Sequence, residues 1–190
     1  GRTLLGANVR TDGPTQEYSD DVVLTANVTL TDSGSSGIDF KSLVDGDGNG
    51  PWDLTLVTED SQATIHIQDQ VGSNERLQSL TVDNAGGLIV ANDADIQLED
   101  QFEQTGDGAV QLGGDILTND GHVLVTSVTD LSQDVRIDTN NDGADITFES
   151  TIELDGNSLE LDAGPDGNIT LQGTVSGNGD VTVDDANTLQ

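Results

Sequence analysis

Oxygen-bearing side chains occur at alternate positions in two glycine-rich stretches, a spacing that could bind a hard cation. The first stretch matches the spacing of an EF-hand calcium loop through Asp138, Asn140, Asp142, Gly143 and Glu149. An EF-hand loop needs flanking helices, whereas the three residues before Glu149 alternate like a strand and would carry Glu149 away from the loop. The sequence therefore favours an Asx-rich chain reversal here, with Asp138, Asn140 and Asp142 kept as calcium candidates.

The second stretch, DGDGNG, places Asp45, Asp47 and Asn49 at alternate positions. Glycine would let such a loop wrap so that the oxygens converge, but the closing glutamate of a calcium loop is missing. These three residues are the second set of calcium candidates. We expect that no cofactor is required and that Ca²⁺ is the one cofactor to consider.

The types of charged residue argue against an enzyme. Lyase chemistry needs a clustered base and cations, but the basic residues are few and scattered. They are Arg2, Arg10, Lys41, Arg76 and Arg136. With 36 acidic residues, any pair of carboxylates at a spacing suited to glycoside hydrolysis is uninformative. Two His and no Cys make a transition-metal site unexpected.

Composition restricts the partners as well. The chain of 190 residues has a formal net charge of −31, which should repel nucleic acid and anionic lipid and attract a diffuse atmosphere of cations. No apolar run approaches the roughly 20 residues that span a bilayer, so we expect no membrane insertion. Aromatic residues make up 3% of the chain, too few for a thick globular core.

The elements that must position these residues are short strands. Triplets of the type apolar-polar-apolar recur along the whole chain, and this alternation with many β-branched residues predicts strands with one buried face. The triplets are residues 28–30, 38–40, 54–56, 65–67, 80–82, 96–98, 110–112, 135–137, 146–148, 152–154, 159–161, 169–171 and 181–183.

Clusters of Gly, Asn, Asp and Ser separate the triplets and predict a sharp corner after each strand. No segment has the spacing of an amphipathic helix, so we expect an all-β fold with essentially no helix. Very short strands, interchangeable aliphatic residues and few hairpin turns favour a right-handed parallel β-helix, or β-solenoid. Coils of roughly 20 residues rising about 4.8 Å each would give about nine coils and a rod of about 40 Å.

Degenerate internal repeats support one elongated segment over residues 1–190. The stretch that begins at Gly37 aligns with the one that begins at Gly143, and 22–30 aligns with 110–118. The tail from Thr182 resembles the stretch from Thr81, and the first residues of the chain would continue that match. We therefore expect one unit of a longer tandem or head-to-tail array, because an open solenoid end exposes unpaired backbone groups.

Four phrases, DGDGNGPWDLTL, RLQSLTVDNAGG, DGADITFESTI and GNITLQGTVSGNGDVTV, resemble the strand repeats of filamentous-haemagglutinin-like adhesins and related giant bacterial exoproteins. That resemblance implies a parallel β-helix shaft that is secreted to the cell surface and serves in adhesion, biofilm or fibre building. This chain departs from the family in being far more acidic.

The expected function is that of a structural subunit of an extracellular bacterial fibre or adhesin shaft that self-associates head to tail into filaments. Two alternatives remain open. One is an adhesin module that binds extracellular glycans, which a cluster of exposed aromatic residues would favour. The other is a secreted, Ca²⁺-dependent module similar to a β-roll, for which calcium-sensitive unfolding would be the evidence.

Overall fold

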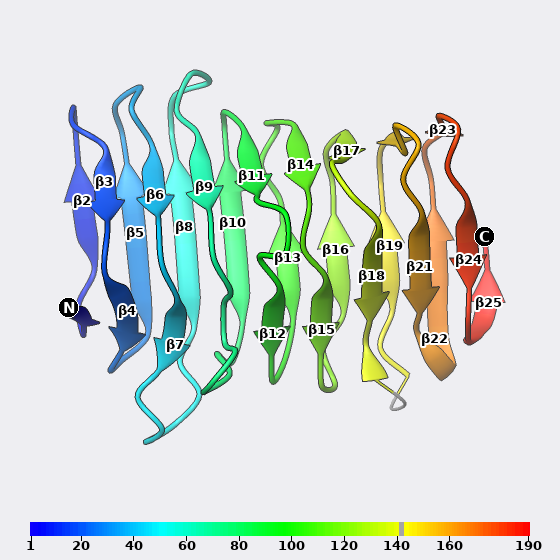
Figure 1. The fold of residues 1–190 in the computed structure, drawn as a ribbon, viewed down its shortest axis with the longest axis horizontal. Coiled ribbons are helices and arrows are strands. Elements are labelled where there is room, and N and C mark those ends of the chain that lie inside the picture. Colours follow the sequence, from blue (N-terminus) through cyan, green and yellow to red (C-terminus); the bar gives the residue numbers. More distant parts are fainter. Residues whose placement is uncertain (141–142) are drawn as a thin grey trace.

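The chain winds into a parallel β-solenoid, as the alternating triplets predict. It makes about eight turns and not the expected nine, because many coils are longer than 20 residues. The computed structural model describes residues 1–140 and 143–190. Strand accounts for 48% of the chain and helix for 1%. Each full coil contributes to each of three faces a strand or, in one coil, a single bridged residue, and all the paired strands are parallel (Figure 1). Within the described residues, no helix is long and apolar enough to cross a membrane.

We name the faces A, B and C in the order in which the chain visits them. Face A comprises β1 (Arg2–Leu5), β4 (Asp21–Leu24), β7 (Val44–Gly46), β12 (Ile96–Leu98), β15 (Ile116–Thr118), β18 (Val135–Asp138), β21 (Leu159–Asp162) and β24 (Val181–Val183). A single bridged residue, Val71, joins β7 to β12, so the two sheets of this face form one continuous ladder.

Face B is the longest sheet. It comprises β2 (Val9–Thr11), β5 (Val28–Asp32), β8 (Leu54–Thr58), β10 (Leu80–Asn84), β13 (Phe102–Gln104), β16 (Val123–Val125), β19 (Ile146–Phe148), β22 (Gly164–Leu171) and β25 (Ala186–Leu189). Face C comprises β3 (Gln16–Tyr18), β6 (Ile38–Phe40), β9 (Ile65–Ile67), β11 (Leu88–Val90), β14 (Val110–Leu112), β17 (Thr129–Leu131), β20 (Ile152–Glu153) and β23 (Val175–Ser176).

The coil is right-handed. In Figure 1 the strands of face B run upward behind those of faces A and C, which run downward in front, while the chain advances from left to right. The length of a coil varies, because paired residues lie between 19 positions apart (Val110 and Thr129) and 27 positions apart (Ile38 and Ile65). Most of the extra residues leave the rod as corner loops. In the long coils face A narrows to the bridges of Val71, and the pairing of β22 with β25 has a register shift between Gly164 and Asn168.

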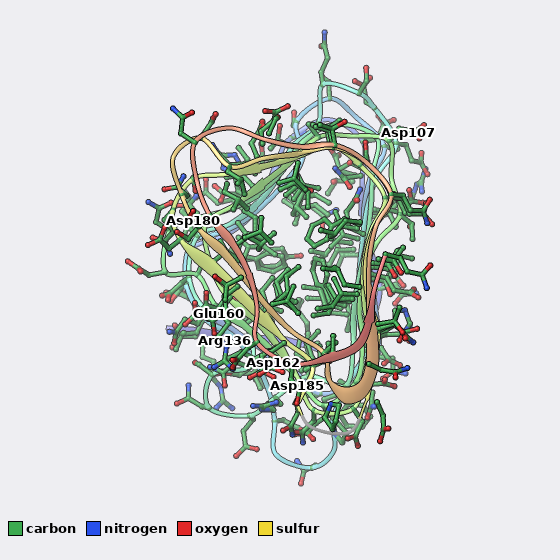
Figure 2. All side chains as sticks on the ribbon, turned by 90° about the vertical axis from the view of Figure 1, so that its right-hand side faces the viewer. Asp107, Arg136, Glu160, Asp162, Asp180 and Asp185 are labelled. Carbon is green, nitrogen blue, oxygen red and sulfur yellow. The ribbon has the colours of Figure 1, made fainter. Side chains whose placement is uncertain are left out.

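Inward side chains of the three faces fill a narrow apolar interior (Figure 2). Strand after strand has the pattern buried, partly exposed, buried, so that each triplet contributes two side chains to the core. The side chains stack in rows of aliphatic residues along the rod, and Phe40, Phe102 and Phe148 are the largest fully buried ones. A core only a few side chains across explains why so few aromatic residues suffice.

Corners bring consecutive backbones so close that some positions admit only glycine. A Cβ added at Gly108 would lie 1.3 Å from the carbonyl oxygen of Gly86, the glycine at the same corner one coil earlier. Beside these glycines, Asn84 and Gln104 point inward and bond to each other, with 2.8 Å between Gln104 Nε2 and Asn84 Oδ1. Both amides also bond to backbone carbonyls, so the polar groups at this corner are satisfied inside the rod.

The internal repeats of the sequence do not lie on equivalent faces. Ile38 belongs to face C, whereas Ile146, its aligned partner, belongs to face B. Likewise Val82 lies on face B and its counterpart Val183 on face A. The alignments are therefore displaced by one face each time. The reason is that a strand and its corner have the same pattern on every face. The unit that repeats in the sequence is therefore one strand with its corner, about a third of a coil, and not a whole coil.

Candidate functional site

The calcium candidates Asp45 and Asp47 lie in β7 and directly after it, and each is held by protein donors. Asp45 is 8% exposed, and its carboxylate accepts hydrogen bonds from the backbone N (3.1 Å) and side-chain Nδ2 (2.8 Å) of Asn74. Asp47 accepts from the side-chain Nδ2 of Asn49 at 2.8 Å and from Trp52 Nε1 at 2.9 Å. These bonds hold the pKa of Asp47 below its ordinary value, and the bond from the Asn49 side chain has the largest effect.

Asp47 and Asn49 thus contact each other, while Asp45 turns to the following coil. The oxygens of the two aspartates serve as acceptors that fix the corner loop, which is the role of an Asx-rich turn. Trp52 closes the same loop. Its ring packs against the core, and its indole N–H donates to Asp47, so the side chain covers the apolar interior at this corner.

The other calcium candidates lie at the end of β18. Asp138 accepts a hydrogen bond from the backbone N of Asn140 at 2.7 Å and pairs with Arg136 at 3.0 Å. The side-chain amide of Asn140 donates to Asn119 Oδ1 at 3.2 Å. Asp142 lies outside the described residues. Over residues 1–140 and 143–190, no group of three or more His, Asp or Glu is arranged to hold a metal ion.

A charge cluster that the sequence did not reveal lies on the outer surface of face A (Figure 2). Arg136 forms ion pairs with Asp138 on its own strand and with Glu160 and Asp162 on the next, at 3.0, 3.1 and 3.1 Å. Partial burial by itself would lower the pKa of Arg136, but the three carboxylates outweigh it and raise that pKa above its ordinary value. One guanidinium therefore neutralises part of an acidic ladder that crosses two coils.

The same ladder continues toward the N-terminus as stacked aspartates. The backbone N of Asp115 donates to Asp95 Oδ1 at 3.0 Å, and the backbone N of Arg136 donates to Asp115 Oδ1 at 2.7 Å. Burial raises the pKa of Asp115, and the neighbouring charges of Asp95 and Asp93 raise it further. The hydrogen bond from the backbone N of Arg136 and the charge of Arg136 lower it, but by less. These aspartates tie successive coils together through backbone N–H groups.

An open, polar groove runs along the corners between faces A and B. It is lined by residues from several coils, among them Pro51, Glu75, Arg76 and Glu99. Arg76 is committed to the fold, because its Nη1 donates to the carbonyl oxygen of Leu98 at 2.9 Å. The groove offers carboxylate groups to the hydroxyl groups of a ligand, but Trp52 does not line it. No aromatic platform for a sugar ring is formed there by the described residues.

Both ends of the rod carry unpaired strand edges. Within residues 1–140 and 143–190, the first coil, β1 to β3, and the last, β23 to β25, each pair with a neighbour on one side only. Of the four large apolar side chains that are clearly exposed among the described residues, three lie in these two coils: Leu4 at 58%, Val181 at 38% and Leu189 at 57%. Open backbone edges with exposed apolar side chains are surfaces on which a further parallel coil can pair.

No protein-family model matches the chain. No curated protein and no solved structure matches it either.

Proposed function

We propose that this chain is a structural segment of an extracellular fibre or adhesin shaft, which is extended end to end by further coils. The observation that carries the proposal is that the parallel ladders of faces A, B and C run from the first coil to the last and are open at both ends. Backbone pairing along the whole axis makes a solenoid stiff, and open edges allow it to be lengthened.

The outer surface suits a shaft that must stay hydrated. With a formal net charge of −31, neighbouring rods repel each other sideways, while pairing along the axis uses backbone groups and apolar residues. A role on the bacterial surface, after secretion, follows from the resemblance to filamentous-haemagglutinin-like exoproteins and is part of this proposal. The parallel β-helix fold is consistent with it.

Small-angle scattering and electron microscopy of the purified chain test the proposal together. We expect a stiff particle about 40 Å long at low concentration, from about eight turns at about 4.8 Å, and longer rods of unchanged width at high concentration. A flexible or compact particle at low concentration would refute the shaft. A stiff particle that never lengthens at any concentration or salt would refute extension by separate copies.

A further inference from the structure

We infer that two copies join head to tail in a fixed register on face A, with Arg2 of one copy beside Asp184 of the other. This inference rests on the proposed end-to-end extension and specifies its joint.

The two ends of the rod differ in charge. The last coil, residues 175–190, contains three aspartates and no Lys or Arg. The first coil, residues 1–18, contains two arginines, one Asp and one Glu, so its side chains have no net formal charge. Arg10 is occupied by Glu59, at 3.0 and 2.8 Å, whereas Arg2 is exposed and forms no ion pair with the described residues. A neutral head with an exposed arginine and an acidic tail favour head-to-tail over tail-to-tail contact.

The register of face A determines which residues would meet. One inward row runs unbroken along this face, and a copy added to the tail in the same register continues it from Val183 to Thr3. The row consists of Thr3, Val22, Val44, Val71, Ile96, Ile116, Ile137, Leu161 and Val183. On the outer side, Arg2 then lies opposite Thr182, and Leu4 lies opposite Asp184.

The structure already contains an arginine that reaches an aspartate diagonally across two neighbouring strands of face A. Arg136 pairs across the sheet with Glu160, and its guanidinium reaches Asp162, two positions further along the neighbouring strand, at 3.1 Å. Asp184 is likewise two positions beyond Thr182, the residue opposite Arg2. Arg136 lies on the strand before that of Asp162, whereas Arg2 would lie on the strand after that of Asp184, so the two diagonals are mirror images with the same offset of one strand and two residues. Such a diagonal is within reach of a long side chain.

The joint also covers apolar surface on face B. In the same register, Ala7 follows Leu189 in the inward row that contains Val28 and Ile169, so the most exposed large apolar residue of the tail gains a neighbour. Face C contributes less. Among the described residues, face C has eight strands where face B has nine. When the added copy pairs on faces A and B, its β3 therefore does not reach β23, and the space of one strand between them stays empty. A joint made by two faces is weaker than a coil within the chain and therefore sensitive to the Arg2–Asp184 pair.

Charge reversal distinguishes this joint from general repulsion. Asp184→Arg lowers the net negative charge, which would strengthen association if repulsion between rods were the only factor. Our joint predicts the opposite, a loss of about three- to tenfold in the association constant at low salt, as for one exposed ion pair turned into a repulsion. Arg2→Glu should weaken association similarly. Asp107→Arg is the matched control, because it makes the same change at an exposed corner between β13 and β14, in the middle of the rod.

Sedimentation velocity at about 50 mM salt, where charges are weakly screened, would measure the association constants. Each of the variants R2E and D184R should associate weakly alone. An equimolar mixture of the two should recover wild-type association, because the reversed head of one variant meets the reversed tail of the other and the two unaltered ends also match.

Two outcomes would distinguish failure of the proposed joint from failure of the proposed shaft. Equal association of D184R and D107R, with the wild type forming long rods, would overturn this joint and leave the shaft intact. A wild-type rod that stays monomeric would overturn both the joint and extension by copies.

Discussion

At the scale of single residues, charge is organised by a few contacts that cross from coil to coil. Arg136 is surrounded by Asp138, Glu160 and Asp162 and neutralises part of the ladder on face A. Because these groups are partly exposed, each pair contributes little alone, but together they offset repulsion among three carboxylates. The stability of this region should therefore depend on one guanidinium and on salt.

Replacing that guanidinium tests the point. Arg136→Gln should lower the free energy of unfolding by about 1–2 kcal/mol at low salt, because three neighbouring carboxylates lose their counter-charge. The loss should shrink at about 1 M salt, where the Debye length is about 3 Å. Urea unfolding followed by circular dichroism measures both values. Arg136→Lys, which keeps the charge, should lose less, and an equal loss for Gln and Lys would mean that packing and not charge is responsible.

Asp115 gives a prediction of opposite sign. Its pKa is raised in the folded chain, so the stability linked to its proton is present below the ordinary value of 3.8 and is lost as the pH rises through the folded pKa. At neutral pH the ionised carboxylate is a small cost. Asp115→Asn keeps an oxygen for the backbone N of Arg136 and should stabilise the chain at neutral pH by at most about 0.5 kcal/mol, given its partial exposure.

Thermal unfolding across pH checks this sign. The gain from Asp115→Asn should disappear at about pH 3, where the aspartate itself is protonated. A gain that does not vary with pH would show that removal of charge is not its cause.

At the scale of elements, the corners specify the fold as strictly as the strands do. Gly108→Ala should destabilise the chain by about 3 kcal/mol or more, because its Cβ would overlap the carbonyl oxygen of Gly86 and force two coils apart. Gly87→Ala is the matched control. Its Cβ would lie 3.5 Å from Thr64 Cγ2, an ordinary contact, so its effect should stay below about 1 kcal/mol. Similar melting temperatures for the two variants would contradict this account of the corner.

The inward amides of Asn84 and Gln104 also stabilise the corners, through hydrogen bonds inside the rod. Gln104 donates from Nε2 to Asn84 and to the carbonyl oxygen of Gly106, and its Oε1 accepts from the backbone N of Ser127 at 3.2 Å. Gln104→Leu has a similar volume but leaves these buried groups unpaired. We expect a loss of about 2–4 kcal/mol in denaturant unfolding, since each unsatisfied buried group costs about 1–3 kcal/mol. A neutral result would mean that water takes over these bonds.

For the whole molecule, net charge dominates the response to solution conditions. A chain with 36 acidic and five basic residues should gain stability from any salt that screens self-repulsion. If cations form a diffuse atmosphere, CaCl₂ and MgCl₂ at equal concentration should raise the melting temperature by similar amounts, and both by more than NaCl. Calorimetry measures the three series. A rise of several degrees with Ca²⁺ over Mg²⁺ would instead indicate a specific calcium site, for which Asp45, Asp47 and Asp138 are the residues to replace.

The sequence by itself determined the class of fold and about half of the strands that the structure describes. Alternation of apolar and polar residues fixes which side chains face inward, and every predicted triplet overlaps a strand. Several of the strands that it missed have a broken alternation. Ile89 in β11 and Leu124 in β16 are apolar where the pattern expects a polar residue, and Gln104 in β13 is polar where it expects an apolar one.

Only the tertiary structure decided how the strands combine. The three faces carry the same local pattern, so the sequence could not say which triplets stack, and its repeats were displaced by one face. The cluster around Arg136 joins residues that are 24 and 26 positions apart, a distance set by the length of one coil and by nothing local. The calcium candidates show the same limit, because spacing along a chain gives the order of oxygens but not the donors, such as Asn74, that fold back to meet them.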